Sequence, residues 1–600
     1  MTAADLVPQH LAIAALAAGY RAGAFTPADV VAAIADRIDR RGDDAVWITV
    51  DPIRAAGHAR ALGGVPDPDR PLWGIPFAVK DNVDVADWPT TAAFPGFARV
   101  ASVTATAVQR VVDAGAILIG KTNLDQFATG LNGTRSPYGI PRSAADPQMI
   151  SGGSSSGSAV AVATGLVSFA LGTDTAGSGR VPAALNGVVG HKPSRGLVSG
   201  HGVVPACRSL DCVSVFATTV QDAVDVVTTM AGTDPNDPWT RRLPSPRILC
   251  EPDPAALRLG VPRHDQLQLS AEHGYDRSWD ELLTTAAAAG VELVEVDLTA
   301  FFDAGRMLYG GPWLAERAAA IRGLVADPDA LEPPVRAVLA DGAAIGGESV
   351  FHGIHRLREF RARAGHVLSS VDALLMPTVE TTFTVTDMLA EPVARNAALG
   401  RFTTFANLLD LCAVAVPVRA ALASRPFGVT VAGTAGSDAQ VAAIAGTIEA
   451  LARGDAAIRR ARPVMPAGGP ARLPVAVVGA HLAGMPLHHE LRDRNARLLT
   501  RTRTAAEYRL VALRTEPPKP GLIHVGEGGA AIEVEVYELP VDEVGGFLAG
   551  ILPPLGIGPV RLADGAEVHG FVCDPVAAAA AEDISAHGGW RAYREASRTT

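Results

Sequence analysis

The spacing of apolar residues predicts two helices at the start of the chain. Residues 9–20 form the first. In the second, apolar side chains recur every three or four residues, at Val30, Val31, Ile34 and Ile38. Thr26 precedes Pro27 and Asp29, an order typical of a helix N-terminus, because the threonine can cap a free amide and proline suits the first turn. We therefore expect the second helix to begin at Pro27.

Short apolar runs and Ala/Val-rich stretches of helical length alternate from about residue 70 to residue 230, with glycines at the turns. The expected strands here are 75–79, 116–119 and 168–171. A mainly helical region follows at about 276–370. Two further buried strands are expected at 374–378 and 413–417. This succession predicts an α/β fold with a central sheet in a domain that spans residues 1–458.

Residues 459–472 interrupt this pattern with arginine, proline and glycine, which suit neither a helix nor a central strand. We interpret them as a linker to a second domain, residues 473–600. That domain is rich in strand patterns and has a glycine-rich stretch at 553–558 before a closing helix. Its expected strands are 473–479, 508–513, 521–525 and 530–539. A smaller α+β or barrel-like unit is expected.

Composition narrows the possible partners. With 48% hydrophobic and 19% charged residues, the chain has enough apolar material for a core and is unlike a disordered protein. The net charge of −11 is spread without long blocks, which argues against nucleic acid or an anionic membrane and favours a small-molecule substrate. The five cysteines are scattered, no leader pattern opens the chain, and the apolar runs are too short for a membrane span. We expect a cytoplasmic protein.

Two serine- and glycine-rich turns flank a predicted helix and strand. They read Ser-Gly-Gly-Ser-Ser-Ser-Gly-Ser at 151–158 and Gly-Thr-Asp-Thr-Ala-Gly-Ser-Gly-Arg-Val-Pro at 172–182. Glycine allows backbone to approach a substrate closely, so such turns can direct amide groups at one point, as an oxyanion hole requires. A flexible linker or a phosphate-binding loop is the alternative reading. The flanking apolar structure disfavours the linker, and the lack of GxxxxGK[ST] disfavours the phosphate loop.

A serine nucleophile needs a base, and no histidine lies near these turns in the order of a Ser-His-Asp enzyme. Lys80 ends the apolar strand Ile-Pro-Phe-Ala-Val-Lys, and burial favours loss of its proton because desolvation disfavours the charged form. Taken alone, such a lysine is more often a surface residue at the end of an edge strand. Together with the serine turns, it becomes a candidate base.

These segments resemble the amidase signature family, and the likeness spans roughly residues 5–455. The resemblance implies a central mixed sheet covered by helices, an acyl-enzyme mechanism, and no metal or other cofactor. In the family, the serine after Gly-Gly follows a cis peptide bond and relays a proton, while the serine of the second turn is acylated. These positions are Ser154 and Ser178, with Lys80 as base. The oxyanion-hole residues implied are Thr175, Ala176, which replaces the usual glycine, and Gly177, together with the amide of Ser178 itself.

A further resemblance, to the allophanate hydrolases within this family, rests on Leu-Tyr-Gly-Gly-Pro-Trp-Leu-Ala-Glu-Arg at 308–317, on Arg-Ser-Pro-Tyr at 135–138, on Ser-Leu-Asp-Cys at 209–212 and on the second domain. It implies that Tyr309 and Arg317 hold a substrate carboxylate. On the residues alone, Arg317 could be a solvated arginine at a helix start. The second domain begins like the allophanate hydrolase C-terminal domain, which resembles a γ-glutamylcyclotransferase fold. His481 matches a histidine there that is implicated in decarboxylation, with a structural histidine as the alternative.

The resulting expectation is hydrolysis of allophanate to ammonia and carbon dioxide by a cytoplasmic homodimer. A functional link to a biotin-dependent urea carboxylase or to a biuret hydrolase is expected as well. Three alternatives stay open at this point. They are a broad-specificity amidase for other small carboxylated amides, the glutaminase subunit of a transamidation complex, and a binding or assembly protein that keeps the fold.

Overall fold

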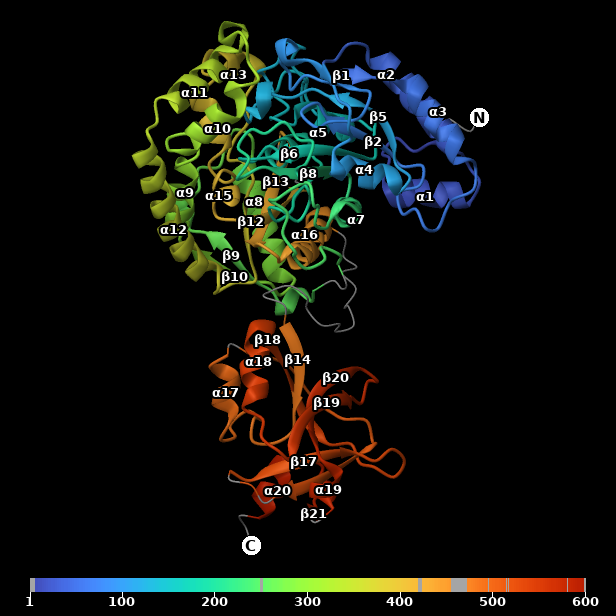
Figure 1. The fold of residues 1–600 in the computed structure, drawn as a ribbon, viewed down its shortest axis with the longest axis vertical. Helices are drawn as coiled ribbons and strands as arrows, with labels where there is room; N and C mark the ends of the chain where they lie inside the picture. The colour runs from blue at the N-terminus through green and yellow to red at the C-terminus, as the bar shows by residue number, and fades with distance from the viewer. Residues whose placement is uncertain are drawn as a thin grey trace. The chain divides into compact units, whose positions relative to one another are not determined.

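The computed structural model describes residues 6–248, 252–418, 424–454 and 472–597, apart from 495, 514, 516 and 580. The chain divides into two compact units, Met1–Pro466 and Ala467–Thr600, and each is considered by itself (Figure 1). Of the predicted linker, residues 459–471 lie outside the described residues, and Arg472 begins a strand of the second unit. The proposed boundaries of the linker therefore stay a prediction.

An eleven-stranded mixed sheet forms the centre of the first unit. Most neighbouring strands are antiparallel, whereas β5, β2 and β6 run parallel to one another, as do β11, β9 and β10. In sheet order the strands are β1 (Trp47–Val50), β5 (Ile117–Thr122), β2 (Pro76–Lys80), β6 (Phe169–Asp174), β8 (Cys212–Ala217), β7 (Val189–Lys192), β12 (Leu411–Val418), β13 (Phe427–Thr434), β11 (Ala373–Pro377), β9 (Arg258–Pro262) and β10 (Glu292–Val296).

Helices cover this sheet. α5 and α6 pack on each other and on the central strands, and a second row runs from α4 through α7 and α16 to α8. Figure 1 shows α9 to α12 on the side of β9 and β10 and α1 to α3 on the side of β1 and β5. The helices are α1 (Ile13–Arg21), α2 (Pro27–Arg41), α3 (Pro52–Leu62), α4 (Thr106–Asp113), α5 (Ser156–Ala163), α6 (Val181–Asn186), α7 (Val220–Met230), α8 (Tyr275–Ala288), α9 (Thr299–Arg306), α10 (Trp313–Arg322), α11 (Pro333–Ala343), α12 (Gly347–Leu368), α13 (Val385–Ala390), α14 (Ala394–Leu399), α15 (Phe405–Leu408) and α16 (Asp438–Arg453).

Local signals placed most of these elements. α2 begins at Pro27 as predicted, and Thr26 and Asp29 cap it reciprocally, each side chain accepting a hydrogen bond from the other's backbone amide. β2, β5, β6, β11 and β12 confirm the expected strands to within a few residues. The expected helical region also contains β10, in which the segment Glu-Leu-Val-Glu-Val forms an edge strand that pairs with β9. The region is mainly helical, as expected, but this short strand within it was not predicted.

The central strands are apolar on both faces because helices cover both, so β2, β5, β6 and β8 are buried throughout. Phe77 of β2 stacks on Phe169 of β6 with ring centroids 5.2 Å apart. Since β2 and β6 are parallel neighbours, their carboxyl ends lie at the same edge of the sheet. Lys80 ends β2 and Asp174 ends β6, so this edge brings the predicted base to the start of the second serine turn.

The second unit has its own apolar core and two sheets. The five-stranded sheet has the order β15 (Arg497–Arg503), β18 (Glu533–Pro540), β14 (Arg472–Val477), β20 (Glu567–Cys573) and β19 (Leu555–Arg561). The other contains β17 (Lys519–His524), β16 (Tyr508–Leu513) and β21 (Glu582–Asp583). Its helices are α17 (His488–Arg492), α18 (Val541–Ala549), α19 (Pro575–Ala578) and α20 (Trp590–Ala596).

This unit is α+β, as expected. The glycine-rich stretch at 553–558, which carried no strand prediction, runs into β19, where Gly558 lies against Val572 of β20. Across the described residues of both units, no helix combines the length and the apolar character needed to cross a membrane.

Candidate active site

Three side chains from the sheet edge and from the two serine turns form a continuous hydrogen-bonded chain. Lys80 Nζ lies 2.8 Å from Ser154 Oγ, and Ser154 Oγ lies 3.0 Å from Ser178 Oγ. Lys80 and Ser154 are fully buried, and Ser178 is only 2% exposed. The structure thus brings together the three residues that the sequence singled out, at distances that allow proton transfer from one to the next.

The burial of Lys80 changes its acid–base behaviour. Desolvation is the main effect and lowers the pKa of Lys80 from 10.5 to about 7. Asp125, Asp211 and Asp174 oppose that change through their negative charges, whereas Arg317 adds to it. A large fraction of Lys80 is therefore neutral near pH 7, as a general base requires.

The turn that carries Ser154 is held by Asp125. The Asp125 carboxylate accepts hydrogen bonds from the amides of Gly133 (3.1 Å) and Arg135 (3.0 Å), and the Asp125 amide donates to the Ser154 carbonyl at 3.1 Å. A side chain at Gly153 would place its Cβ 2.2 Å from Asp125 Oδ2, so glycine is required there. The peptide bond between Gly153 and Ser154 is cis, as the resemblance implied.

A buried ion pair shapes the turn that carries Ser178. Arg180 binds Asp174 through two nitrogens at 2.9 and 3.0 Å. Although desolvation acts in the opposite direction, Arg180 and the hydrogen bonds to Asp174 hold the pKa of that carboxyl below its ordinary value. Asp174 also accepts the amides of Gly177 (2.9 Å) and Gly179 (3.0 Å), so the turn folds around this carboxylate.

The predicted oxyanion-hole amides differ in their availability. The Gly177 amide is bonded to Asp174, whereas the amides of Thr175, Ala176 and Ser178 have no acceptor among the described residues. Gly177 has a φ of +138°, and a Cβ there would lie 2.3 Å from Thr403 Oγ1, so a side chain does not fit. Ala176 is outside the left-handed region, which is why alanine can stand there in place of glycine.

Of the predicted carboxylate-binding pair, Tyr309 precedes α10 and Arg317 lies in its second turn. Arg317 is 1% exposed, and its guanidinium carbon lies 5.7 Å from the ring centroid of Tyr309. Arg317 Nη1 donates to Thr129 Oγ1 at 2.9 Å. Its Nη2 is buried and has no hydrogen-bond partner in the described part of the chain. A buried guanidinium nitrogen with an unused donor suits an anionic ligand, because an unpaired buried polar group is otherwise costly.

Sequence reasoning missed three contacts of this site. Thr173 Oγ1 accepts from Lys80 Nζ at 2.8 Å, Thr129 holds Arg317, and Asp211 accepts from Thr175 Oγ1 at 2.5 Å. Thr173 and Asp211 lie inside motifs that the sequence highlighted, Gly-Thr-Asp and Ser-Leu-Asp-Cys, so proximity to a motif was an available signal. Thr129 carries no such signal, because 188 residues separate it from Arg317.

His481 lies in the second unit, at the turn after β14. It is 7% exposed, its Nε2 lies 3.2 Å from Glu490 Oε2, and its ring stacks on Phe571 at 4.9 Å. Desolvation lowers the pKa of His481, against the opposing effect of Glu490. His488 begins α17. The described residues hold no group of three or more His, Cys, Asp and Glu side chains placed to bind a metal ion.

Comparison with known families gives two matches. Residues 29–442 match the family described as Amidase, and residues 473–595 match the family described as Allophanate hydrolase C-terminal domain. These matches confirm both resemblances drawn from the sequence at the level of family. The likeness of the second unit to γ-glutamylcyclotransferase stays a prediction.

Individual proteins resemble the chain over most of its length. Urea amidolyase from Saccharomyces cerevisiae is 38% identical over 88% of this chain, which spans only 30% of that protein. The Kluyveromyces lactis allophanate hydrolase structure has a TM-score of 0.73 and 35% identity, covering 95% of this chain and 97% of that one. The crystal structure of Kluyveromyces lactis urea amidolyase has a TM-score of 0.75 and 34% identity, covering 98% of this chain but 37% of its own.

Proposed function

Because this chain belongs to the amidase family, we propose that it hydrolyses allophanate to ammonia and carbon dioxide through an acyl-enzyme on Ser178. The observation that carries the proposal is the buried chain from Lys80 through Ser154 to Ser178. It supplies a nucleophile, a relay and a base with a pKa near 7, and no histidine is needed.

The mechanism follows from the direction of proton flow. Neutral Lys80 donates to Thr173 and keeps its lone pair for the Ser154 proton, while Ser154 takes the proton of Ser178. The Ser178 oxygen attacks the amide carbon, and the proton returns along the same path to the leaving nitrogen, which departs as ammonia. Water then repeats the sequence to release the acyl group.

The oxyanion donors are assigned to the amides of Thr175, Ala176 and Ser178. These three are uncommitted among the described residues, whereas Gly177 contributes by holding the turn through Asp174. Preorganised amides of this kind stabilise the negative charge that develops on the carbonyl oxygen in the transition state. No metal or other cofactor takes part in this scheme.

The substrate is assigned through Arg317 and Tyr309. Allophanate is a urea that bears a carboxylate, so it offers an amide to Ser178 and an anion to the unused donor of Arg317. Tyr309 packs beside the guanidinium and can donate its hydroxyl to the same carboxylate. The extensive likeness to a solved allophanate hydrolase, in both units, supports this choice.

His481 is proposed to act on the first product, N-carboxycarbamate, in the second unit. Its burial beside Glu490 and Phe571 also suits a structural histidine, so ammonia and carbon dioxide must be measured separately for His481→Ala. A loss of carbon dioxide release with unchanged first-step ammonia release supports the catalytic role. Equal loss of both supports the structural one.

A cytoplasmic homodimer, linked to a biotin-dependent urea carboxylase or a biuret hydrolase, completes the proposal. Support for the carboxylase link comes from the urea amidolyase relative, which is much longer than this chain. Sedimentation of the full chain tests the dimer. Coupled turnover of urea with a separate carboxylase tests the link.

Ammonia release from allophanate, malonamate and biuret by the full chain tests the main proposal. We expect allophanate to be the preferred substrate and Ser178→Ala to be inactive. A chain that prefers malonamate would instead be a broad-specificity amidase for carboxylated amides, the second candidate, since Arg317 recognises any well-placed carboxylate. Ammonia release that survives in Ser178→Ala would contradict the acyl-enzyme itself.

A further inference from the structure

The segment Ala206–Asp211 lies between α10 and the turn that carries Ser178. On its α10 side, Glu316 accepts hydrogen bonds from the Ser209 amide (2.7 Å) and hydroxyl (2.6 Å), and from Cys207 Sγ at 3.2 Å. Glu316 is the neighbour in sequence of Arg317, the proposed carboxylate ligand. The segment is therefore fixed to the same helix turn that recognises the substrate anion.

On its other side, the segment holds the nucleophile turn through Asp211. The Asp211 carboxylate accepts the Thr175 hydroxyl at 2.5 Å and the amides of Ala206 (2.9 Å) and Cys207 (3.1 Å). Thr175 is the first residue after β6 and one of the proposed oxyanion donors. Because its side chain is tied to Asp211, the direction of its amide depends on where Asp211 sits.

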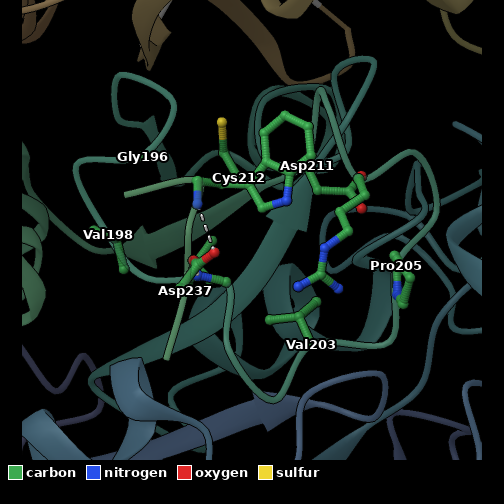
Figure 2. A pocket seen from close by; sticks show the side chains of 11 residues that line it. Gly196, Val198, Val203, Pro205, Asp211, Cys212 and Asp237 are labelled. Carbon is green, nitrogen blue, oxygen red and sulfur yellow. Dashed lines mark hydrogen bonds between the residues drawn. The ribbon is translucent and has the colours of Figure 1, made fainter. Parts of the chain in front are cut away.

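Asp211 also lines a cavity beside the site. Figure 2 shows it in the wall with Cys212, Val203, Pro205 and Asp237. The cavity walls also include Arg208, which is exposed. The Asp237 carboxylate, in contrast, accepts hydrogen bonds from the amides of Gly200 and Trp239 and from the Ser199 hydroxyl, and among the described residues it has no hydrogen bond to the nucleophile turn. Asp211 is thus the carboxylate of this cavity that reaches the catalytic machinery.

We propose that Asp211 is a positioning residue for the hydrolysis, which orients Thr175 and links the oxyanion turn to the helix that binds the substrate carboxylate. The proposal rests on the proposed function, since it concerns the same Ser178 site. Hydrogen bonds to a charged group are roughly twice as strong as neutral ones, which explains why a carboxylate holds this turn. Asp211 touches neither Ser178 nor Lys80, so it acts through Thr175.

Charged groups surround Asp211 from several elements. Lys80 of β2 and Arg317 of α10 interact with Asp211 electrostatically. Cys207 lies on the same segment as Asp211 and close to Glu316. Arg208 and Asp237 line the same cavity as Asp211. Desolvation raises the pKa of Asp211 to about 6, against the opposing effects of Thr175 and Arg317. Asp211 is therefore mostly ionised at pH 7, and its charge raises the pKa of Lys80.

Asp211→Asn separates positioning from a merely structural role. Losing a charged hydrogen bond to Thr175 should lower kcat about 10- to 100-fold with little change in KM. Removing the negative charge should also lower the pKa of Lys80, so the acidic limb of the kcat–pH profile should move to lower pH. A loss of fold alone would lower the active fraction without moving that limb.

Two matched variants sharpen the test. Asp237→Asn removes the same charge from the same cavity, and Glu316→Gln removes a charge from the far side of the segment. Neither carboxylate is among the main charges that act on Lys80, so both variants should move the acidic limb much less than Asp211→Asn does. If Asp211→Asn keeps the wild-type kcat and limb, or if Asp237→Asn moves the limb equally, the proposal is overturned.

A second pair of variants covers the case in which Asp211→Asn does not fold. Thr175→Val removes only the hydroxyl and should lose kcat as Asp211→Asn does, whereas Thr175→Ser keeps the hydroxyl and should retain most of it. Wild-type kcat in Thr175→Val refutes the link. Ser178→Ala in the same assay separates this outcome from failure of the proposed function, because without Ser178-dependent ammonia release the hydrolysis itself is wrong.

Discussion

Replacing Arg317 with alanine tests the substrate assignment most directly. The side chain is 1% exposed, its Nη1 is held by Thr129, and its Nη2 has no partner among the described residues. A substrate carboxylate would complete the guanidinium in a site with little water. Truncating one partner of such a buried charged pair costs about 2–5 kcal/mol. Because Thr129 already accepts a hydrogen bond from one nitrogen of Arg317, we expect Arg317→Ala to lose about 2–4 kcal/mol of this interaction free energy.

That free energy corresponds to a loss in kcat/KM for allophanate of roughly 30- to 700-fold, at 1.4 kcal/mol for each tenfold change. The loss should appear mainly in KM, because the carboxylate is bound equally in the ground state and the transition state. Biuret has no carboxylate, so its kcat/KM should change far less. Ammonia release from both substrates, measured on the same enzyme preparations, gives the comparison.

The same variant carries a second readout. Arg317 lowers the pKa of Lys80 by its positive charge, so its removal should raise that pKa. Because neutral Lys80 is the active form, the acidic limb of the kcat–pH profile should then move to higher pH, opposite to the change expected for Asp211→Asn. Equal losses on allophanate and biuret would show that Arg317 supports the fold instead of the carboxylate, and would refute the assignment.

The remaining predictions concern the base, the relay and the ion pair. Wild-type kcat should rise with pH through about 7, as Lys80 loses its proton; a limb that stays in place in Lys80 variants with residual activity would point to another base. Ser154→Ala and Lys80→Ala should each lose several orders of magnitude of kcat in ammonia release, and the double variant should be little worse, because relay members act as a unit. Arg180→Leu should lower the free energy of unfolding by about 3–5 kcal/mol, since Asp174 is left buried without its partner, and denaturant titration checks this. An unchanged midpoint would contradict it.

The part of the site that the sequence predicted lies in short, contiguous motifs. Lys80, Ser154 and Ser178 each stand in a segment whose glycines and apolar flanks mark a turn or a strand end, so the residues could be singled out without a structure. Their meeting point follows from β2 and β6 being parallel neighbours, which places both carboxyl ends at one edge. Local patterns therefore singled out the segments of the proton path, and the family resemblance assigned the roles of the two serines.

The surrounding contacts could not be predicted in this way. Thr129 meets Arg317 and Asp211 meets Thr175 only because loops from distant parts of the chain close on one another, and no period or cap signals such a meeting. The hydrogen bond from the Gly177 amide to Asp174 could not be predicted either, because it depends on the orientation of one peptide plane. β10 was missed because a short amphipathic run within helical text becomes a strand only beside β9.

The effect of the lowered Lys80 pKa on the stability of the fold shows why these distant groups matter. A fall in its pKa from 10.5 to about 7 corresponds to a cost of about 5 kcal/mol for holding the ammonium in the folded protein, at 1.36 kcal/mol for each pKa unit. Because the pKa of Lys80 is lower in the folded protein than in the unfolded chain, its protonation destabilises the folded protein. The cost is present in full below pH 7 and disappears as the pH rises through 10.5. Asp125, Asp211 and Asp174 reduce it, and Arg317 increases it. A closer carboxylate would stabilise the fold at neutral pH and, by keeping the proton on Lys80, would remove the base. The balance of opposite charges therefore sets the working pH, at the expense of stability.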